Sequence, residues 1–251
     1  EALPDNHTLL ISQMGDMEGS TPGNLVLYDT RSGALQTVFP VKMERVAHAP
    51  DWGARDCPGM PDGRFAPHGM ALRQRDDGRW QLAVINHGGR ESVEMFEVLQ
   101  TSTGYTLDWR GCMVPPDGTW MNDLALLANG GFVASHMFDR HGNVIGGMRT
   151  GMWKAFLGLD TGYVFEWQPQ QPSIRILDGS RGSFPNGVAV TRDDRTVYAA
   201  MCTGDELRTI ERSSGKQQSS IKVSQPDNLA WDQQGRLLVA GVTASLAEQQ
   251  A

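Results

Sequence analysis

Four short segments of the sequence place a polar side chain at the same point of a repeated pattern. The segments are PHGMALRQRDDGRWQLAVINH, MNDLALLANGGFVASH, PNGVAVTRDDRTVYAA and PDNLAWDQQGRLLVAG, and each continues as apolar strand, polar turn and second apolar strand. The repeated position, called the slot below, holds His68, Asn122, Asn186 and the pair Asp227 and Asn228. Imidazole, amide and carboxylate groups can hold a metal ion or move a proton. The pattern therefore indicates a site that takes one donor from each repeat.

The oxygen donors of the slot favour a hard cation. The slot side chains Asn122, Asn186, Asp227 and Asn228 offer amide and carboxylate oxygens. Such oxygens suit calcium better than zinc or copper. A single asparagine before a strand is more often a turn residue. Because equivalent positions of several repeats carry such donors, the metal-ligand interpretation is the stronger one here.

His68 and His87 form a second candidate group. They are 19 residues apart, one at the start of a predicted strand and the other at the end of the next. Antiparallel pairing of these strands would bring both imidazoles to the same end of the hairpin. Two such histidines can be ordinary structural residues. A neutral imidazole near a polarised carbonyl can also take a proton from water, and both interpretations stay open on the residues alone.

The elements that must position these residues are strands. Strand patterns bounded by turn residues cover 8–13, 24–28, 80–86, 92–99, 132–136, 163–167, 196–200 and 237–240. Corresponding slot residues are 54, 64 and 42 positions apart, close to the ~40–50 residues of a propeller blade with loop insertions. The sequence therefore predicts an all-β fold, a single β-propeller domain over 1–251. About four to five blades are present, so we expect a fragment truncated at both ends.

Two insertions stand apart from the repeats. Residues 42–64 are rich in Pro, Gly and Asp and predict a long surface loop. Residues 137–161 contain a helix-competent stretch near 150–159, and residues 245–251 form another. In the first stretch four apolar side chains fall on or near one helical side: Met148, Met152, Trp153 and Phe156. They would form either an amphipathic helix over the fold or an apolar wall of a ligand pocket.

Composition excludes several classes of partner. The chain has 22 Lys and Arg against 29 Asp and Glu, a net charge of −7, and no basic cluster, which argues against nucleic-acid binding. No apolar run approaches the ~18 residues of a membrane span. Cys57, Cys112 and Cys202 form no CxxC motif; one pair could bridge, and at least one thiol stays free. The compartment is not encoded in these residues, and an extracytoplasmic location stays open.

The motifs FAPHGM, VINH, NDL, MWKAFLGLDTGYVFEW, FPNG and PDNLA occur in this order from residue 65 to about 231. In motif and order the chain resembles the serum paraoxonase group of calcium-dependent lactonases and arylesterases. That group lies within the wider gluconolactonase (SMP-30) and strictosidine-synthase-like superfamily. The resemblance covers about two-thirds of the chain. It implies a six-bladed propeller that holds two calcium ions, one catalytic and one structural.

The resemblance also implies roles for individual residues. It places the catalytic-calcium ligands on Asn122, Asn186, Asp227 and Asn228, the structural-calcium ligands on Asp123 and the backbone carbonyl of Met70, and the histidine dyad on His68 and His87. The family further uses a Glu-Asp pair whose positions fall before Glu1. Without that pair the site has one carboxylate and three neutral amides, which should weaken calcium binding.

The function expected on this basis is calcium-dependent hydrolysis of a small-molecule lactone or ester. His68 would act as general base, with His87 relaying the proton or orienting it. Three alternatives remain. They are a sugar lactonase of the gluconolactonase type, a strictosidine-synthase-like protein without metal, and a non-catalytic binding propeller whose polar slots satisfy turns or a structural ion.

Overall fold

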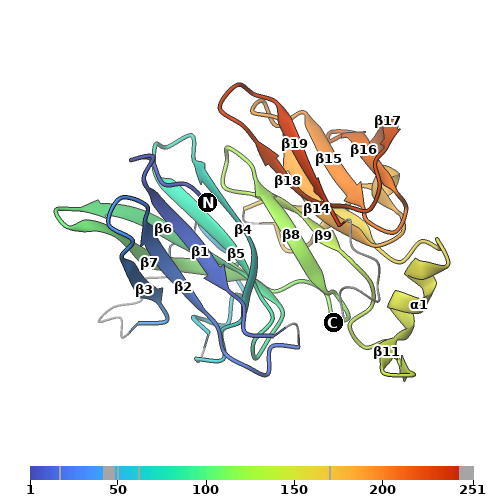
Figure 1. The fold of residues 1–251 in the computed structure, drawn as a ribbon, viewed down its shortest axis with the longest axis horizontal. Helices are drawn as coiled ribbons and strands as arrows, with labels where there is room; N and C mark the ends of the chain where they lie inside the picture. Colours follow the sequence, from blue (N-terminus) through green and yellow to red (C-terminus); the bar gives the residue numbers. More distant parts are fainter. Residues whose placement is uncertain (17, 42–48, 50, 62, 170, 243–251) are drawn as a thin grey trace. The chain divides into compact units, whose positions relative to one another are not determined.

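The computed structural model describes residues 1–16, 18–41, 49, 51–61, 63–169 and 171–242 (Figure 1). The chain forms two compact units. Unit 1 comprises Glu1–Pro116, Leu126–Phe132 and Trp167–Ile174, and unit 2 comprises Asp117–Ala125, Val133–Glu166 and the described part of the chain from Arg175 onward. The prediction of a single domain over 1–251 stays a prediction. The helix-competent stretch at 245–251 lies outside the described residues.

Unit 1 contains two antiparallel sheets whose strands follow one another in sequence. The first consists of β1 (Thr8–Gln13), β2 (Asn24–Asp29) and β3 (Leu35–Phe39). The second consists of β4 (Pro67–Gln74), β5 (Trp80–Asn86), β6 (Ser92–Thr101) and β7 (Gly104–Met113). The β4–β5 turn is the predicted RDDG segment, in which Gly78 has a φ of +85° that favours glycine. The order β4-β5-β6-β7 is that of a propeller blade.

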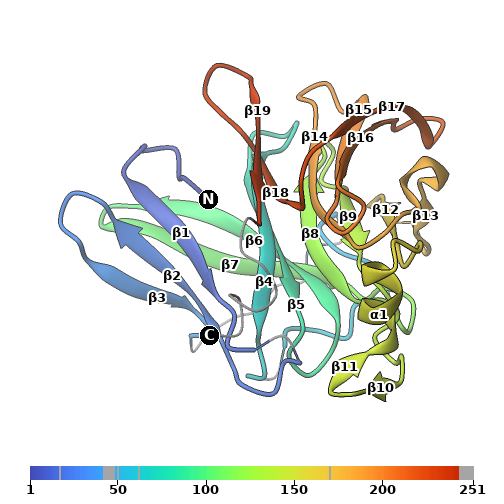
Figure 2. The same ribbon diagram turned by 45° about the vertical axis from the view of Figure 1, so that its right-hand side comes forward.

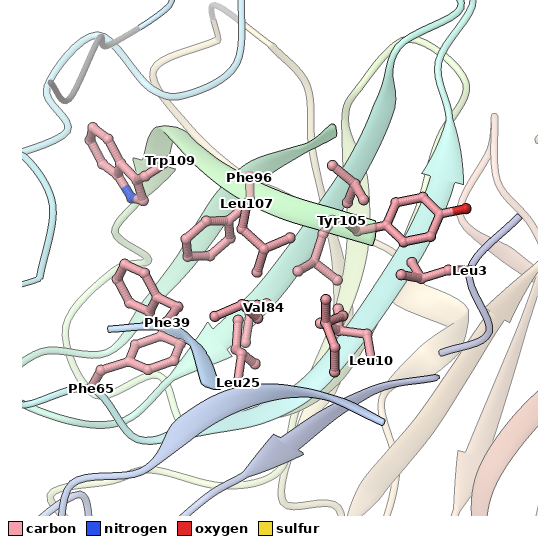
Figure 3. Packing of buried hydrophobic residues seen from close by; sticks show 14 of the residues in the cluster. Leu3, Leu10, Leu25, Phe39, Phe65, Val84, Phe96, Tyr105, Leu107 and Trp109 are labelled. Atoms are coloured by element: carbon pink, nitrogen blue, oxygen red, sulfur yellow. The ribbon is translucent and has the colours of Figure 1, made fainter. Parts of the chain in front are cut away.

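The core of unit 1 lies between these two sheets (Figure 3). Leu10 and Leu25 come from the first sheet, and Val84 and Phe96 come from the second; all are completely buried. Phe39 contacts the rings of Phe65 and Phe96 edge-on, with centroids 4.8 and 4.9 Å away. This geometry is favourable for aromatic pairs. The core therefore holds the strand ends from which His68 and His87 extend.

The segment 51–57 differs from the predicted surface loop. Trp52 is completely buried, and the guanidinium of Arg75 lies 4.7 Å from its ring centroid. A Cβ at Gly53 would lie 2.7 Å from the backbone nitrogen of Cys112, so only glycine allows this approach to β7. Cys57 and Cys112 form a disulfide. The Gly and Pro residues here belong to a tightly packed strap, so the prediction of an exposed surface loop is wrong for 51–57.

Unit 2 contains most of a second blade and all of a third. The sheet order β13-β12-β9-β8 joins β8 (Met121–Leu126), β9 (Phe132–His136), β12 (Tyr163–Trp167) and β13 (Arg175–Ile176), followed by the 3-10 helix η1 (Asp178–Ser180). The next sheet joins β14 (Pro185–Val190), β15 (Thr196–Met201), β16 (Glu206–Glu211) and β17 (Lys216–Lys222). A hairpin of β18 (Pro226–Trp231) and β19 (Leu237–Gly241) completes the described strands.

The insertion between β9 and β12 carries a short hairpin and a helix. The hairpin is β10 (Val144–Ile145) and β11 (Met148–Arg149), and α1 (Thr150–Phe156) follows it directly. Figure 2 shows the helix beside this hairpin. Ser183 Oγ donates to the carbonyl of Ala155 at 3.0 Å and thereby attaches the end of α1 to the segment that leads into β14. The helix predicted near 150–159 is confirmed, with an earlier end.

Candidate active site

Each slot residue is the second residue of the first strand of its sheet. His68 has this place in β4, Asn122 in β8, Asn186 in β14 and Asp227 in β18. The four slot residues therefore occupy the same position in their respective strands. Asn228 follows Asp227 and is exposed.

A β-bulge lies at the slot in β4, β14 and β18. In β4 the register passes from Pro67↔Asn86 to Met70↔Val84, so the first strand advances three residues while its partner advances two. The same shift occurs from Pro185 to Val188 in β14 and from Pro226 to Leu229 in β18. A bulge changes the direction in which a side chain points and is common beside active sites. The repeat thus encodes a backbone irregularity together with a donor.

Two of the three bulges follow a residue with unusual backbone geometry. Phe184 precedes Pro185 with a φ of 52°, and Gln225 precedes Pro226 with a φ of 38°. Side chains other than glycine rarely adopt positive φ, and such strain occurs preferentially at functional sites. Asp205 stabilises the second of these turns, because its carboxylate accepts the backbone N–H of Gln225 at 2.9 Å. Thr161 Oγ1 likewise accepts the backbone N–H of Phe184 at 2.9 Å, so a side-chain acceptor holds each of the two turns.

His68 and His87 meet in unit 1, as predicted. His68 Nδ1 lies 3.1 Å from His87 Nε2. His87 Nδ1 lies 2.8 Å from Glu91 Oε2, and the His87 side chain is completely buried. We call Glu91, His87 and His68 the imidazole relay. Glu91 was missed by the sequence analysis, although its place four residues after His87, just before β6, could have indicated that the turn returns it to the imidazole.

The backbone around the relay is fixed by Asn86. Its Oδ1 accepts the N–H groups of Ala66 at 2.9 Å and of Gly88 at 3.0 Å, which joins the start of β4 to the end of β5. A Cβ at Gly88 would lie 1.7 Å from the carbonyl oxygen of Arg64, so the residue after His87 must be glycine. These contacts hold both imidazoles in one arrangement.

Burial keeps His68 neutral. Desolvation, and secondarily the neighbouring His87, lower the pKa of His68 to about 4. A neutral imidazole has one nitrogen lone pair that can accept a proton. The relay can therefore act as a base at neutral pH without first losing a proton.

Asn186 and Asp227 meet in unit 2, together with the free thiol of Cys202. The Asn186 side chain interacts with both the Asp227 carboxylate and Cys202 and opposes the rise of their pKa values. Burial raises the pKa of Asp227, and burial followed by the charge of Asp227 raises the pKa of Cys202 to about 11. We call these three residues the amide cluster. Cys202 could not be found from the sequence, where it is one cysteine at the end of a strand.

The amide cluster fits a divalent cation. Asn186 is 5% exposed, and its Oδ1 is buried without a hydrogen-bond partner. A buried acceptor in this state costs about 1–3 kcal/mol. Among the described residues no Lys, Arg or His forms an ion pair with Asp227. An oxygen-binding cation would satisfy the Asn186 oxygen and neutralise the Asp227 carboxylate at once.

The other predicted ligands, Asn122 and Asp123, already form hydrogen bonds within the protein. Asn122 Nδ2 donates to Met137 Sδ at 3.3 Å. Asp123 Oδ2 accepts the backbone N–H of Val188 at 3.0 Å, which joins β8 to the bulge of β14. Met70 belongs to unit 1 and Asp123 to unit 2, so the shared structural-calcium site stays a prediction. Within the described residues no three His, Cys, Asp or Glu side chains cluster as a metal site, whereas the predicted set relies on amide oxygens.

A pocket of about 370 Å³ opens over the amide cluster. Its lining consists of Met152, Phe156, Phe184, Asn186, Cys202, Thr203, Asp205, Gln225 and Val242. Of the four apolar residues predicted as a wall, Met152 and Phe156 line this pocket. Met148 lies in the hairpin strand β11, and Trp153 Nε1 donates to the carbonyl of Ile145 at 3.0 Å. The helix therefore presents two of its apolar side chains to the pocket and uses Trp153 to hold the hairpin.

The remaining described histidines have structural partners. His136 Nδ1 accepts the backbone N–H of Trp120 at 3.1 Å, and burial lowers the pKa of His136 to about 4. His141 bonds to Asp117 and His7 to Asp5, on more exposed parts of the chain. His48 lies outside the described residues. No helix among the described residues is long and apolar enough to cross a membrane.

Comparison with known proteins extends this description. A sequence profile of the arylesterase family matches residues 14–244. The chain belongs to the arylesterase family. No curated protein matches it by sequence.

Solved structures support the β-propeller fold of this chain. It is similar to the β-propeller domain of Myceliophteria thermophila Cps50 (Swd1), with 12% identity, a TM-score of 0.55 and coverage of 96% of this chain and 62% of that one. The gluconolactonase XC5397 from Xanthomonas campestris gives 16% identity, a TM-score of 0.54 and coverage of 93% and 66%. A luciferin-regenerating enzyme has 11% identity and a TM-score of 0.52, with coverage of 96% of this chain and 67% of that one. The β-propeller prediction is confirmed, and the chain spans about two thirds of these structures.

Proposed function

We propose that the protein is a calcium-dependent hydrolase of lactones or esters. The observation that carries this proposal is the amide cluster, in which Asn186, whose Oδ1 is buried without a hydrogen-bond partner, lines a pocket and interacts with the desolvated Asp227 carboxylate. Membership of the arylesterase family supports the same class of reaction. The substrate would be a small molecule, because the pocket volume is about 370 Å³.

The catalytic calcium would be bound by Asn122, Asn186, Asp227 and Asn228. When bound there, calcium would polarise the substrate carbonyl and stabilise the negative charge that develops on its oxygen. A second, structural calcium would be held by Asp123 and the backbone carbonyl of Met70, as the family resemblance implies.

Proton transfer is assigned to the imidazole relay. His68 would accept a proton from the attacking water, and His87 would orient His68 and share the charge. The depressed pKa of His68 keeps it in the accepting form at neutral pH. After the ester bond breaks, the same imidazole would return the proton to the leaving alkoxide.

The pocket lining favours an acyl or aromatic substrate over a sugar. Met152, Phe156, Phe184 and Val242 contribute apolar surface. Of the polar lining residues, Asn186 is a proposed calcium ligand and Asp205 accepts the backbone N–H of Gln225, which leaves few side chains to bond a sugar. A sugar lactone would need hydrogen-bond partners for most of its hydroxyls. The gluconolactonase alternative therefore ranks second.

The test is hydrolysis by the intact protein of an aryl ester, an aliphatic lactone and gluconolactone, each with calcium and with a calcium chelator. We expect turnover of the first two with calcium, and its loss on chelation. Preference for gluconolactone would favour the sugar-lactonase alternative. If calcium changes thermal stability but no compound is hydrolysed, the protein is a binding propeller and the proposal is wrong.

A further inference from the structure

Glu91 sits behind the histidine pair and has no assigned role. Its Oε2 lies 2.8 Å from His87 Nδ1, its side chain is 9% exposed, and the imidazole between it and His68 is completely buried. The opposite ring nitrogen of His87 lies 3.1 Å from His68 Nδ1. The three groups thus form one line of hydrogen bonds that ends at His68 Nε2.

The direction of these bonds follows from the chemistry of the carboxylate. An ionised carboxylate has no proton and can only accept, so His87 Nδ1 must donate to Glu91. A neutral imidazole carries one N–H, which leaves His87 Nε2 as an acceptor. His68 Nδ1 must then donate to it, and the lone pair of His68 falls on Nε2. The carboxylate therefore selects the tautomer of both rings.

We propose that Glu91 is a positioning residue that fixes the tautomers of His87 and His68 and leaves Nε2 of His68 as the basic atom. The tautomer assignment rests on the hydrogen-bond geometry alone. The expected effect on kcat rests in addition on the proposed hydrolase function. With a wrong tautomer His68 would present an N–H where a base is needed. Groups that orient a histidine in this way affect turnover more than substrate binding.

Two variants test the role of the carboxylate. Glu91→Leu keeps the size of the side chain and removes the acceptor. Glu91→Gln keeps a polar group of the same shape, but its amide can donate as well as accept, so it no longer forces one tautomer. We expect kcat to fall about 10- to 100-fold in the Leu variant and about 2- to 10-fold in the Gln variant, with KM within twofold.

The decisive measurement is the nitrogen-15 NMR spectrum of the histidine rings at one fixed pH. In the wild type we expect a single tautomer of His87, protonated at Nδ1. In both variants we expect the Nε2-protonated tautomer to appear. Asp117→Asn is the matched control, because Asp117 makes a bond of the same 2.8 Å length to His141 on an exposed part of the chain. It should change neither kcat nor the spectrum of His87.

The outcomes separate this inference from the proposed function. If the wild type hydrolyses esters and both variants keep the Nδ1-protonated tautomer and full kcat, Glu91 does not position the relay. If the Leu variant does not fold, an unchanged tautomer in the Gln variant alone overturns the inference. If the wild type hydrolyses nothing, the hydrolase proposal fails while the NMR spectra still decide the tautomer assignment.

Discussion

The imidazole relay and the amide cluster treat their polar atoms in opposite ways. In the relay, the hydrogen bonds run without a gap from Glu91 through His87 to His68. In the amide cluster, Asn186 Oδ1 is buried without a partner, and burial disfavours the charge of Asp227. The relay is therefore complete as the chain folds. The amide cluster contains an unsatisfied oxygen and a buried carboxylate, and a bound cation would stabilise both. The comparison therefore distinguishes residues that need a ligand from residues that do not.

Asp227→Asn should have the largest effect, because it removes the only carboxylate among the four predicted catalytic ligands. We expect kcat to fall by at least about 10³-fold, in line with the several kcal/mol that a bound metal ion can contribute. Stabilisation by calcium, about 2.7 kcal/mol at a hundredfold excess over Kd, should also disappear. Thermal unfolding with and without calcium measures the second effect, with Asp193→Asn in an exposed turn as control. Calcium stabilisation that survives in D227N would remove Asp227 from the ligand set.

His68→Gln should have the next largest effect and should separate the two regions. General-base catalysis contributes about 10²- to 10⁴-fold, so kcat should fall by about 10²- to 10³-fold. Calcium should stabilise this variant as well as the wild type, since the relay holds no catalytic-calcium ligand. His141→Gln serves as the control. Undiminished hydrolysis in H68Q would mean that the relay takes no part in the reaction.

Acid should affect stability through His136, which lies in the same unit as the amide cluster. Its pKa is about 4 when folded, below the ordinary value of about 6.5, so the folded state binds fewer protons. The stability is therefore full above pH 6.5 and falls as the pH drops toward 4, by about 3 kcal/mol. His136→Asn offers an oxygen near the position of Nδ1 and cannot titrate. Urea unfolding at both pH values should show a smaller loss for H136N, and an equal loss would exclude His136 as the cause.

Phe156→Ala should have the smallest effect and should act on the pocket alone. Removing this partly exposed wall costs about 1–2 kcal/mol of substrate binding, or roughly 5- to 30-fold in kcat/KM for an aromatic ester. The loss should be smaller for a small aliphatic lactone, and calcium stabilisation should not change. Trp153→Ala, which alters the same helix but not the pocket lining, is the matched control. Equal losses in both variants would indicate damage to α1 in place of a lost substrate contact.

The sequence predicted the parts of the fold that repeat. The bounds expected for 8–13, 80–86, 132–136 and 163–167 agree with β1, β5, β9 and β12, because apolar runs between turn residues specify these strands. The strand β17 was missed, since KQQSSIK is fully exposed and its sequence shows no apolar alternation. An outer strand takes its conformation from pairing with β16, which a local pattern cannot reveal.

For the candidate site, the sequence predicted donors but not the contacts that tune them. His68 and His87 were expected to meet, because a hairpin fixes their separation. Glu91 and Cys202 were missed, since each acquires its partner only through folding. The three cysteines allow three possible disulfide pairs. The pair Cys57 and Cys112 forms because the 51–57 strap packs against β7, a tertiary contact that the sequence does not reveal.

The bulge that recurs at β4, β14 and β18 also has an evolutionary consequence. One extra residue at each slot sets which face of the strand every later side chain occupies, because side chains alternate along a strand. Point mutations can exchange imidazole, amide and carboxylate at this position while the register stays the same. Loss of a single codon there would straighten the pairing and turn the donor away. The fold should therefore tolerate a change in the side chain at the slot more readily than a change in the length of the strand there.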